Sequence, residues 1–350
     1  MATCLLGLVF SVLVTLIPSL IAMAILWWLD RYEKEPLWLL GIAFFWGAVP
    51  TIALSLLAQL LIDAPLMDLL GQSSLYPLAS LSLVAPLTEE TFKALILLAI
   101  FWVYRQEFDS VMDGILYGAL IGFGFSIVET FFYLIGSLME GGWAEWGLVV
   151  ALRVGLYNLN HSLFAACTGL GFGLARNRRA AWQRWVYPFL GWLFAVLLHG
   201  IHNAGSALAE STGGASVLIS TAVDWIGVLG MLVLIVYAVS REKRWFEELR
   251  AEVENGVITA DEAQIASSYG ARVARGWQML QAHGLLATLH WSRFVQTVVD
   301  LAYKKHQKEA AREGAATDER ITRLRERIAR LRPELPTIGE VGQQPRETEL

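Results

Sequence analysis

Long continuous apolar runs fill the first 240 residues of this 350-residue chain, and they limit its fold more than any other feature. Each run is long enough for a helix to cross the hydrocarbon core of a bilayer. The runs do not alternate as strands would, and only helices or closed barrels satisfy the backbone inside lipid. The sequence therefore predicts an all-α, polytopic membrane protein with about seven transmembrane helices. The expected spans are 4–29, 37–62, 79–104, 110–139, 147–175, 185–209 and 215–240.

Charged residues divide the chain into two regions. The first 240 residues hold only 9 of the 27 Lys and Arg residues and 15 of the 32 Asp and Glu residues. The remaining 110 hold the other 18 and 17, and a helix-capping signal at Thr259 indicates that this region is helical. We therefore expect a transmembrane domain over 1–240, a cytoplasmic helical domain over 241–335 and a disordered tail over 336–350. The net charge of −5 argues against nucleic acid as a partner.

Basic residues in the loops give an orientation. Lys and Arg follow the first, third, fifth and seventh runs, whereas the loops at 63–78, 140–146 and 210–214 contain none. Positive loops mark the cytoplasmic side of a membrane. We therefore expect a multi-pass protein of the cell membrane, surrounded by the lipid bilayer, with its N-terminus outside and its C-terminus in the cytoplasm.

The third run carries charges in its middle. Glu89, Glu90 and Lys93 lie there, and a charge at the bilayer centre costs about 2.5–3.5 kcal/mol. A structural ion pair between Glu89 and Lys93, which are one helical turn apart, accounts for only one of the two carboxylates. Ionisable residues inside a membrane indicate a functional site by default.

Polar residues recur at a similar depth in three other runs. At a rise of about 1.5 Å per residue, Glu89, Glu129 and His199 lie about 15 Å from the outer ends of their runs, and His161 lies about 20 Å from its own. Four different helices thus bring ionisable groups to one level. We expect these side chains to meet in a shared pocket inside the bilayer.

Spacing within the helices supports that expectation. Residues four apart lie on one face of a helix. Three such pairs occur at this level: Glu89 with Lys93, Phe125 with Glu129, and His199 with Asn203. Asp224 has no comparable neighbour and is interpreted as structural or supporting, and Arg153 lies close enough to the outer interface to snorkel there.

Glycines recur every four residues in the fourth run, at Gly114, Gly118 and Gly122. Small residues at this spacing let two membrane helices approach closely. The pattern predicts tight packing of the fourth run against a neighbour, without indicating what the helices do.

Carboxylates and imidazoles together suit hydrolysis. Peptide hydrolysis needs an activated water, an acid for the leaving amine and stabilisation of an oxyanion. In one route, His161, His199 and a Glu hold zinc or another divalent metal, and a second Glu is the general base. In the other, no metal takes part: a Glu activates the water, and a His with Asn203 stabilises the oxyanion. The residues themselves leave both routes open.

Four short blocks follow one another on successive predicted helices. They are EExxK at Glu89–Lys93, FxxxE at Phe125–Glu129, a block that begins at His161, and HxxxN at His199–Asn203. In this order they resemble the PrsW family of multi-spanning intramembrane proteases, which is distantly similar to the CAAX-prenyl-protease-like CPBP/Abi group. The resemblance covers about residues 30–240. His202 stands where the resemblance leads us to expect an aromatic residue, so either His199 or His202 could be the working imidazole.

The resemblance implies a membrane-embedded peptidase, usually described as a metalloprotease, that acts on a membrane-protein substrate. The best-known role in the family is site-1 cleavage of an anti-sigma factor in regulated proteolysis, but the motifs do not specify the substrate. The expected site has Glu89, Glu90, Glu129 and Asn203 as catalytic residues, His161 and His199 as metal ligands with Glu129 as an alternative ligand, and Lys93, Phe125 and His202 beside them.

Two other classes of protein are compatible with buried acids and imidazoles. A proton- or ion-coupled transporter uses such groups as relays. The sequence shows neither an inverted repeat nor paired broken helices, which makes a transporter less favoured. A non-catalytic scaffold could use the same polar residues to hold its helices together.

Overall fold

A computed structural model describes most of the chain, namely residues 2–30, 34–71, 73–105, 107–176, 178, 180–311 and 315–335. Every regular element within these residues is helical, as predicted for an all-α protein. The chain forms two compact units. The first comprises Met1–Asp30 and Lys34–Val239, and the second continues from Ser240. The segment 336–350, predicted to be disordered, lies outside the described residues.

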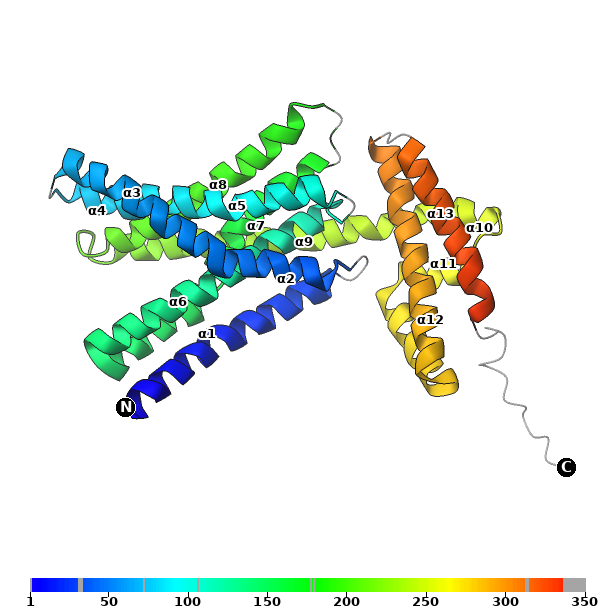
Figure 1. Cartoon of the computed structure of the whole chain (residues 1–350), viewed down its shortest axis with the longest axis horizontal. Helices are drawn as coiled ribbons and strands as arrows, with labels where there is room; N and C mark the ends of the chain where they lie inside the picture. Colours follow the sequence, from blue (N-terminus) through cyan, green and yellow to red (C-terminus); the bar gives the residue numbers. More distant parts are fainter. Residues whose placement is uncertain are drawn as a thin grey trace. The chain divides into compact units, whose positions relative to one another are not determined.

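The first unit is a bundle of long helices (Figure 1). Short π-helical turns, labelled η1 to η3, interrupt several of them. The elements are α1 (Ala2–Leu29), α2 (Leu37–Trp46), η1 (Gly47–Thr51), α3 (Ile52–Leu70), α4 (Leu75–Ala79), η2 (Ser80–Val84), α5 (Ala85–Val103), α6 (Val111–Val149), η3 (Val150–Leu156), α7 (Asn160–Arg176), α8 (Gln183–Ala207) and α9 (Ala215–Trp245).

Five stretches of the described chain are long and apolar enough to cross a membrane. They are Leu5–Leu29, Leu37–Leu70, Val111–Arg176, Gln183–Ala207 and Ala215–Glu254. The predicted span 79–104 is not among them because Glu89, Glu90 and Lys93 interrupt its apolar character. Val111–Arg176 contains two predicted spans, 110–139 and 147–175. The number of stretches differs from seven because one predicted span carries charges and two others fall within a single apolar stretch.

Two breaks in the helices differ from the predicted boundaries. The segment 140–146, predicted as a loop, is helical except at Gly142, whose φ of 69° is readily adopted only by glycine. The span predicted over 147–175 is instead interrupted after η3, and α7 begins at Asn160. Asn side chains compete with the helix for backbone hydrogen bonds and so favour helix starts. The break places His161 in the first turn of α7.

The centre of the bundle is the contact between α6 and α7, whose residues are largely buried. Gly114, Gly118 and Gly122 of α6 lie directly against α7. A Cβ atom added at Gly118 would come within 2.4 Å of the Ala165 carbonyl oxygen, and one at Gly122 within 2.2 Å of that of His161. The predicted close packing at these glycines is therefore confirmed.

The second unit is also helical. Its elements are η4 (Phe246–Leu249), α10 (Arg250–Glu254), α11 (Ala260–Ser267), α12 (Tyr269–Ala311), α13 (Ala315–Leu331) and η5 (Arg332–Glu334). Thr259 caps α11 in a reciprocal arrangement with Glu262, as the sequence predicts. The core of this unit contains Trp291 and Phe294, and the fully buried Glu252 accepts hydrogen bonds from side chains of α12 and α13.

Candidate active site

Helix α5 contributes two acids and one base to the interior of the bundle. Glu90 is fully buried, and Glu89 and Lys93 are nearly so. The Nζ atom of Lys93 lies 2.7 Å from Oε1 of Glu90 and 3.9 Å from Oε2 of Glu89. Lys93 therefore neutralises mainly Glu90, although the spacing in the sequence suggested Glu89 as its partner. Buried ions are tolerated when they are paired in this way.

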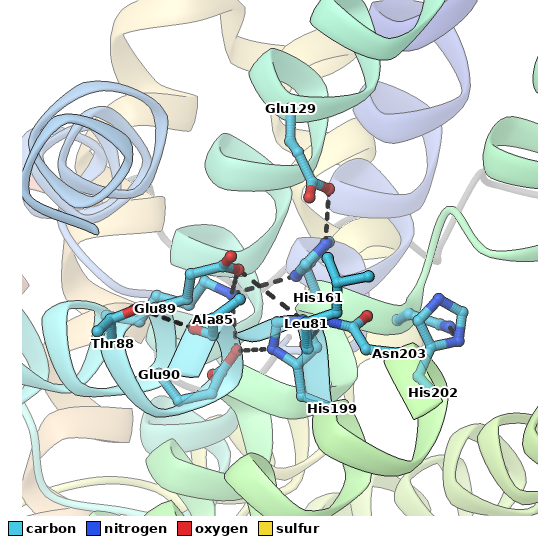
Figure 2. A network of polar contacts seen from close by, with 12 residues as sticks. Leu81, Ala85, Thr88, Glu89, Glu90, Glu129, His161, His199, His202 and Asn203 are labelled. Carbon is cyan, nitrogen blue, oxygen red and sulfur yellow. Dashed lines mark hydrogen bonds and ion pairs between the residues drawn. The ribbon is translucent and has the colours of Figure 1, made fainter. Parts of the chain in front are cut away.

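His199 of α8 joins the two carboxylates of α5 (Figure 2). Its Nδ1 atom lies 2.9 Å from Oε1 of Glu90, and its Nε2 atom lies 3.8 Å from Oε2 of Glu89. Since a carboxylate only accepts hydrogen bonds, we assign the imidazole proton to Nδ1. The Nε2 lone pair then faces Glu89. The Phe164 ring of α7 stacks on the imidazole, with ring centroids 4.9 Å apart.

His161 of α7 is held in the same manner by Glu129 of α6. The His161 Nε2 atom lies 2.8 Å from Oε2 of Glu129, and its Nδ1 atom lies 3.1 Å from Nζ of Lys93. An ammonium group only donates, so Nδ1 is the acceptor and Nε2 carries the proton. The rings of His161 and His199 are 5.0 Å apart. Each imidazole thus has a carboxylate on its outer nitrogen, while the inner nitrogen of His199 faces Glu89 and that of His161 accepts a hydrogen bond from Lys93.

Phe125 closes one side of this cluster. Its ring lies 4.0 Å from the Lys93 Nζ atom and 4.8 Å from the His161 ring centre. An ammonium group over an aromatic face is stabilised by the ring quadrupole. The phenyl ring of the FxxxE block therefore contacts both the buried lysine and one imidazole.

His202 and Asn203 occupy different positions. His202 Nδ1 lies 2.7 Å from Oδ2 of Asp224, and the Asn160 amide donates to the same oxygen at 2.9 Å. Figure 2 shows the His202 ring apart from Glu89 and Glu90. The structure therefore brings His199, and not His202, to the acids of α5. Asn203 donates from Nδ2 to the carbonyl oxygen of Leu81, in the π-helical turn η2, at 2.8 Å.

Sequence reasoning missed some residues of the site. Arg153, interpreted as a snorkelling side chain, instead donates from Nη1 to Oε2 of Glu129 at 2.7 Å. The reason is that an ionised acid inside the bundle is a stronger partner for a guanidinium than the interface. Gln59 of α3 lies 3.4 Å from Oε1 of Glu89. A charged residue inside an apolar run was the available signal for Arg153, whereas no pattern singled out Gln59.

The donor set suits a divalent metal. Glu89, His161 and His199 each offer one ligand atom, and these atoms lie within 4.8 Å of one another. Oε2 of Glu89 is buried and has no hydrogen-bond partner in the described chain. Two imidazoles and one carboxylate are a common ligand set for catalytic zinc, whose ligand bonds of about 2.0–2.2 Å would require these side chains to move slightly inward. The residues present therefore fit such an ion.

These helices of membrane-spanning length, with acids and imidazoles buried between them, define a membrane-embedded protein with a hydrolase-type site. The model of the family described as PrsW family intramembrane metalloprotease matches residues 35–239. This chain therefore belongs to the PrsW family and is an intramembrane protease, a hydrolase of peptide bonds. Membership in this family does not favour the transporter alternative.

Curated relatives carry the same family name. Protease PrsW of Clostridioides difficile (strain 630) is 30% identical over 196 residues, which cover 55% of this chain and 76% of the relative. Protease PrsW of Geobacillus kaustophilus (strain HTA426) is 29% identical over 175 residues, or 50% and 69% of the two chains. Protease PrsW of Bacillus subtilis (strain 168) is 28% identical over 175 residues, or 50% and 72%. No solved structure gives a significant match to the chain.

Proposed function

We propose that this intramembrane protease holds a divalent metal ion, zinc in the simplest case, between Glu89, His161 and His199. The observation that supports this assignment is the pairing of both imidazoles with outer carboxylates. Glu90 holds Nδ1 of His199, and Glu129 holds Nε2 of His161. Outer carboxylates of this kind orient metal-binding histidines and increase their basicity. The Nε2 lone pair of His199 and the unpartnered oxygen of Glu89 then face the ion, and Nδ1 of His161 would exchange its hydrogen bond from Lys93 for the metal.

A bound zinc ion would lower the pKa of its water to about 7 and polarise the scissile carbonyl. The chain's own groups complete the site. Lys93 balances the charge of the buried acids and donates a hydrogen bond to Glu90, and before the ion binds it also donates to His161. Glu89 and Glu90 each have a buried oxygen without a hydrogen-bond partner among the described residues, and that of Glu89 faces Nε2 of His199, so we assign Glu89 to bind the ion or to accept a proton from water. In this proposal Glu129 orients His161 and is not itself a ligand.

Asn203 remains our candidate for the group that stabilises the oxyanion. One of its two amide N–H bonds is directed to the carbonyl of Leu81, which leaves the second for a substrate. Removal of one oxyanion donor from a hydrolase costs about 10²–10³ in kcat. Asn203→Ala should therefore lower kcat with little change in KM.

Substrate and orientation are further parts of the proposal. We infer a single-pass membrane protein as substrate, with an anti-sigma factor as the first candidate because of the family's best-known role. The distribution of basic loops supports an N-terminus outside the cell and a cytoplasmic second unit. Reporter fusions after residues 70 and 240 test the orientation, since an enzyme active only outside the cytoplasm should report at the first position and not at the second.

Metal analysis is the experiment that tests the site. The protein is purified in detergent, its metal content is measured by mass spectrometry, and cleavage of a single-pass substrate is followed in proteoliposomes. We expect one metal per active wild-type chain and its loss in His161→Ala, His199→Ala and Glu89→Gln. Glu140→Gln, which changes an exposed acid further along the same long helix as Glu129, is the matched control. Full cleavage by protein that contains no metal would contradict the metal site and support the route in which a glutamate activates water.

A further inference from the structure

We propose that Arg153 is a positioning residue of the proteolytic site, which holds Glu129 against His161 and thereby fixes one metal-binding imidazole. The predicted effect of Arg153 on metal affinity rests on the proposed metal site. The evidence for its positioning role comes from contacts of Arg153 that the metal assignment does not use. Arg153 lies in the π-helical turn η3, just before the chain enters α7.

Arg153 and His161 both donate a hydrogen bond to the same carboxylate oxygen of Glu129. Oε2 of Glu129 accepts a hydrogen bond from Nη1 of Arg153 at 2.7 Å and another from Nε2 of His161 at 2.8 Å. The position of the carboxylate is therefore set from two sides, by the guanidinium and by the imidazole. Without the guanidinium, the carboxylate could rotate away and the His161 ring would lose its outer support.

A second contact restricts the guanidinium itself. Its Cζ atom lies 3.3 Å from the centre of the Tyr133 ring. Tyr133 follows Glu129 by one turn of α6, so both contacts of Arg153 come from one face of one helix. A planar guanidinium can lie flat on a ring and still direct its N–H groups in a fixed fork to a carboxylate, whereas an ammonium has neither the flat face nor the fork. This double contact distinguishes Arg153 from a side chain that merely extends towards the interface.

The charges of the site are also divided between two bases. Lys93 of α5 pairs with Glu89 and Glu90 of the same helix. Arg153 of η3 pairs with Glu129, which belongs to α6. The Glu129 and Arg153 side chains are about one quarter exposed, at 22% and 26%, whereas Glu90 is fully buried. Arg153 is therefore the cation of the more accessible part of the cluster. Its loss would leave a carboxylate inside the bundle with only an imidazole beside it, an unfavourable arrangement at low dielectric.

The test compares Arg153→Gln, Arg153→Lys and Arg178→Gln. Arg178 is the matched control because its guanidinium also lies over a tyrosine ring, that of Tyr187, while its Nε donates to a backbone carbonyl and not to an acid of the site. Zinc affinity is measured by equilibrium dialysis, and kcat and KM are measured with a single-pass substrate. We expect Arg153→Gln to weaken zinc binding and lower kcat, each by about 10–100-fold, with little change in KM. Arg153→Lys should recover part of both losses, and Arg178→Gln should resemble wild type.

A double-mutant cycle with Glu129→Gln separates positioning from general stability. If Arg153 acts through Glu129, the double variant should have the kcat of Glu129→Gln alone, because the second change removes nothing further. Additive losses, or wild-type zinc affinity and kcat in folded Arg153→Gln, would overturn the proposal. If Arg153→Gln does not fold, the same cycle is carried out with Arg153→Lys.

The two proposals fail differently. Wild-type protein that is active without zinc would refute the proposed metal site, yet the cycle on kcat would still decide whether Arg153 positions Glu129 and His161. Conversely, if the wild type and Arg153→Gln bind zinc equally tightly, the role of Arg153 is refuted and the metal site stands.

Discussion

The Nδ1 atom of His199 lies 2.9 Å from Oε1 of Glu90, although the two residues are 109 positions apart in the chain. The carboxylate accepts a hydrogen bond from the imidazole N–H, so the other ring nitrogen is directed towards Glu89. His161 stands in the same relation to Glu129. A hydrolytic site of this kind depends as much on the acids behind its histidines as on the histidines themselves.

Replacement of Glu90 by Gln tests this relationship most directly. The amide keeps the shape of the side chain but loses the charge that strengthens the His199 hydrogen bond and pairs with Lys93. We expect metal affinity to fall by about 10–100-fold and cleavage to fall with it. Metal titration of Glu90→Gln beside Glu140→Gln checks this. Equal affinity in the two variants would show that Glu90 does not support a metal-binding histidine.

Replacement of Lys93 by Met should destabilise the protein in a metal-dependent manner. The ammonium group lies between Glu90 and His161, and its removal leaves buried acids without their base. Breaking such a buried pair costs about 3–5 kcal/mol. A bound dication would supply positive charge nearby, so the loss should be smaller with zinc than with a chelator. Unfolding in detergent under both conditions measures the difference, and equal losses would argue against an ion beside Lys93.

His202 and His199 should respond differently to substitution. His202 pairs with Asp224 outside the acid cluster, whereas His199 lies inside it. His202→Phe should therefore retain bound metal and lose only about 1–3 kcal/mol of stability, because Asp224 loses a hydrogen-bond donor. His199→Phe should lose the metal. Metal content of the two purified variants decides the question, and the opposite outcome would make His202 the working imidazole.

Gly122→Ala should disrupt the contact on which the site is built. The added methyl group would lie 2.2 Å from the carbonyl oxygen of His161, and that backbone cannot move without moving the imidazole. Overpacking of this kind costs about 1–3 kcal/mol. Gly136→Ala, on the same helix, is the control because no atom lies within 4 Å of its added Cβ. If both variants unfold and cleave alike, the approach of α6 to α7 is not limiting.

The second unit should lose stability in acid through Glu252. Burial by itself would raise the pKa of Glu252, but hydrogen bonds from Arg325 and Lys305 outweigh it and hold that pKa below its ordinary value. The folded unit therefore binds this proton less readily than the unfolded chain. The stabilisation is complete above the ordinary pKa of about 4.3 and is lost as pH falls through the lower folded value.

Hydrogen exchange in α10 and α13 of the full-length protein, measured between neutral pH and about pH 3, checks this expectation. Glu252→Gln should remove most of the acid-dependent opening. Glu319→Gln is the control because Glu319 forms an ion pair with Arg323 in which both side chains are about two-thirds exposed, and exposed pairs contribute little. An unchanged acid response in Glu252→Gln would show that other carboxylates control this unit.

Some features of the site could be predicted and others could not, for physical reasons. Glu89, Glu90, Glu129, His161 and His199 could be selected because a polar group in an apolar run is unusual wherever it occurs. The partners of these residues could not be selected in this way. Spacing on α5 suggested Glu89 as the partner of Lys93, yet Glu90, three residues before Lys93 and so also on its side of the helix, is the nearer acid. Arg153 was interpreted as a side chain that snorkels to the outer interface because no local pattern reveals that Glu129 lies beside it.

The sequence by itself determined the all-α class, the membrane location, the close contact at the glycines of α6 and the family, because hydrophobicity, helical spacing and short motifs are properties of contiguous residues. The tertiary structure alone decided which nitrogen of each imidazole faces an acid, that His199 and not His202 joins the cluster, and that Arg153 turns inward. Those outcomes depend on the rotation and relative depth of helices far apart in the chain. A shift of a helix by one residue, in rotation or in depth, would exchange the partners while leaving every local sequence pattern unchanged.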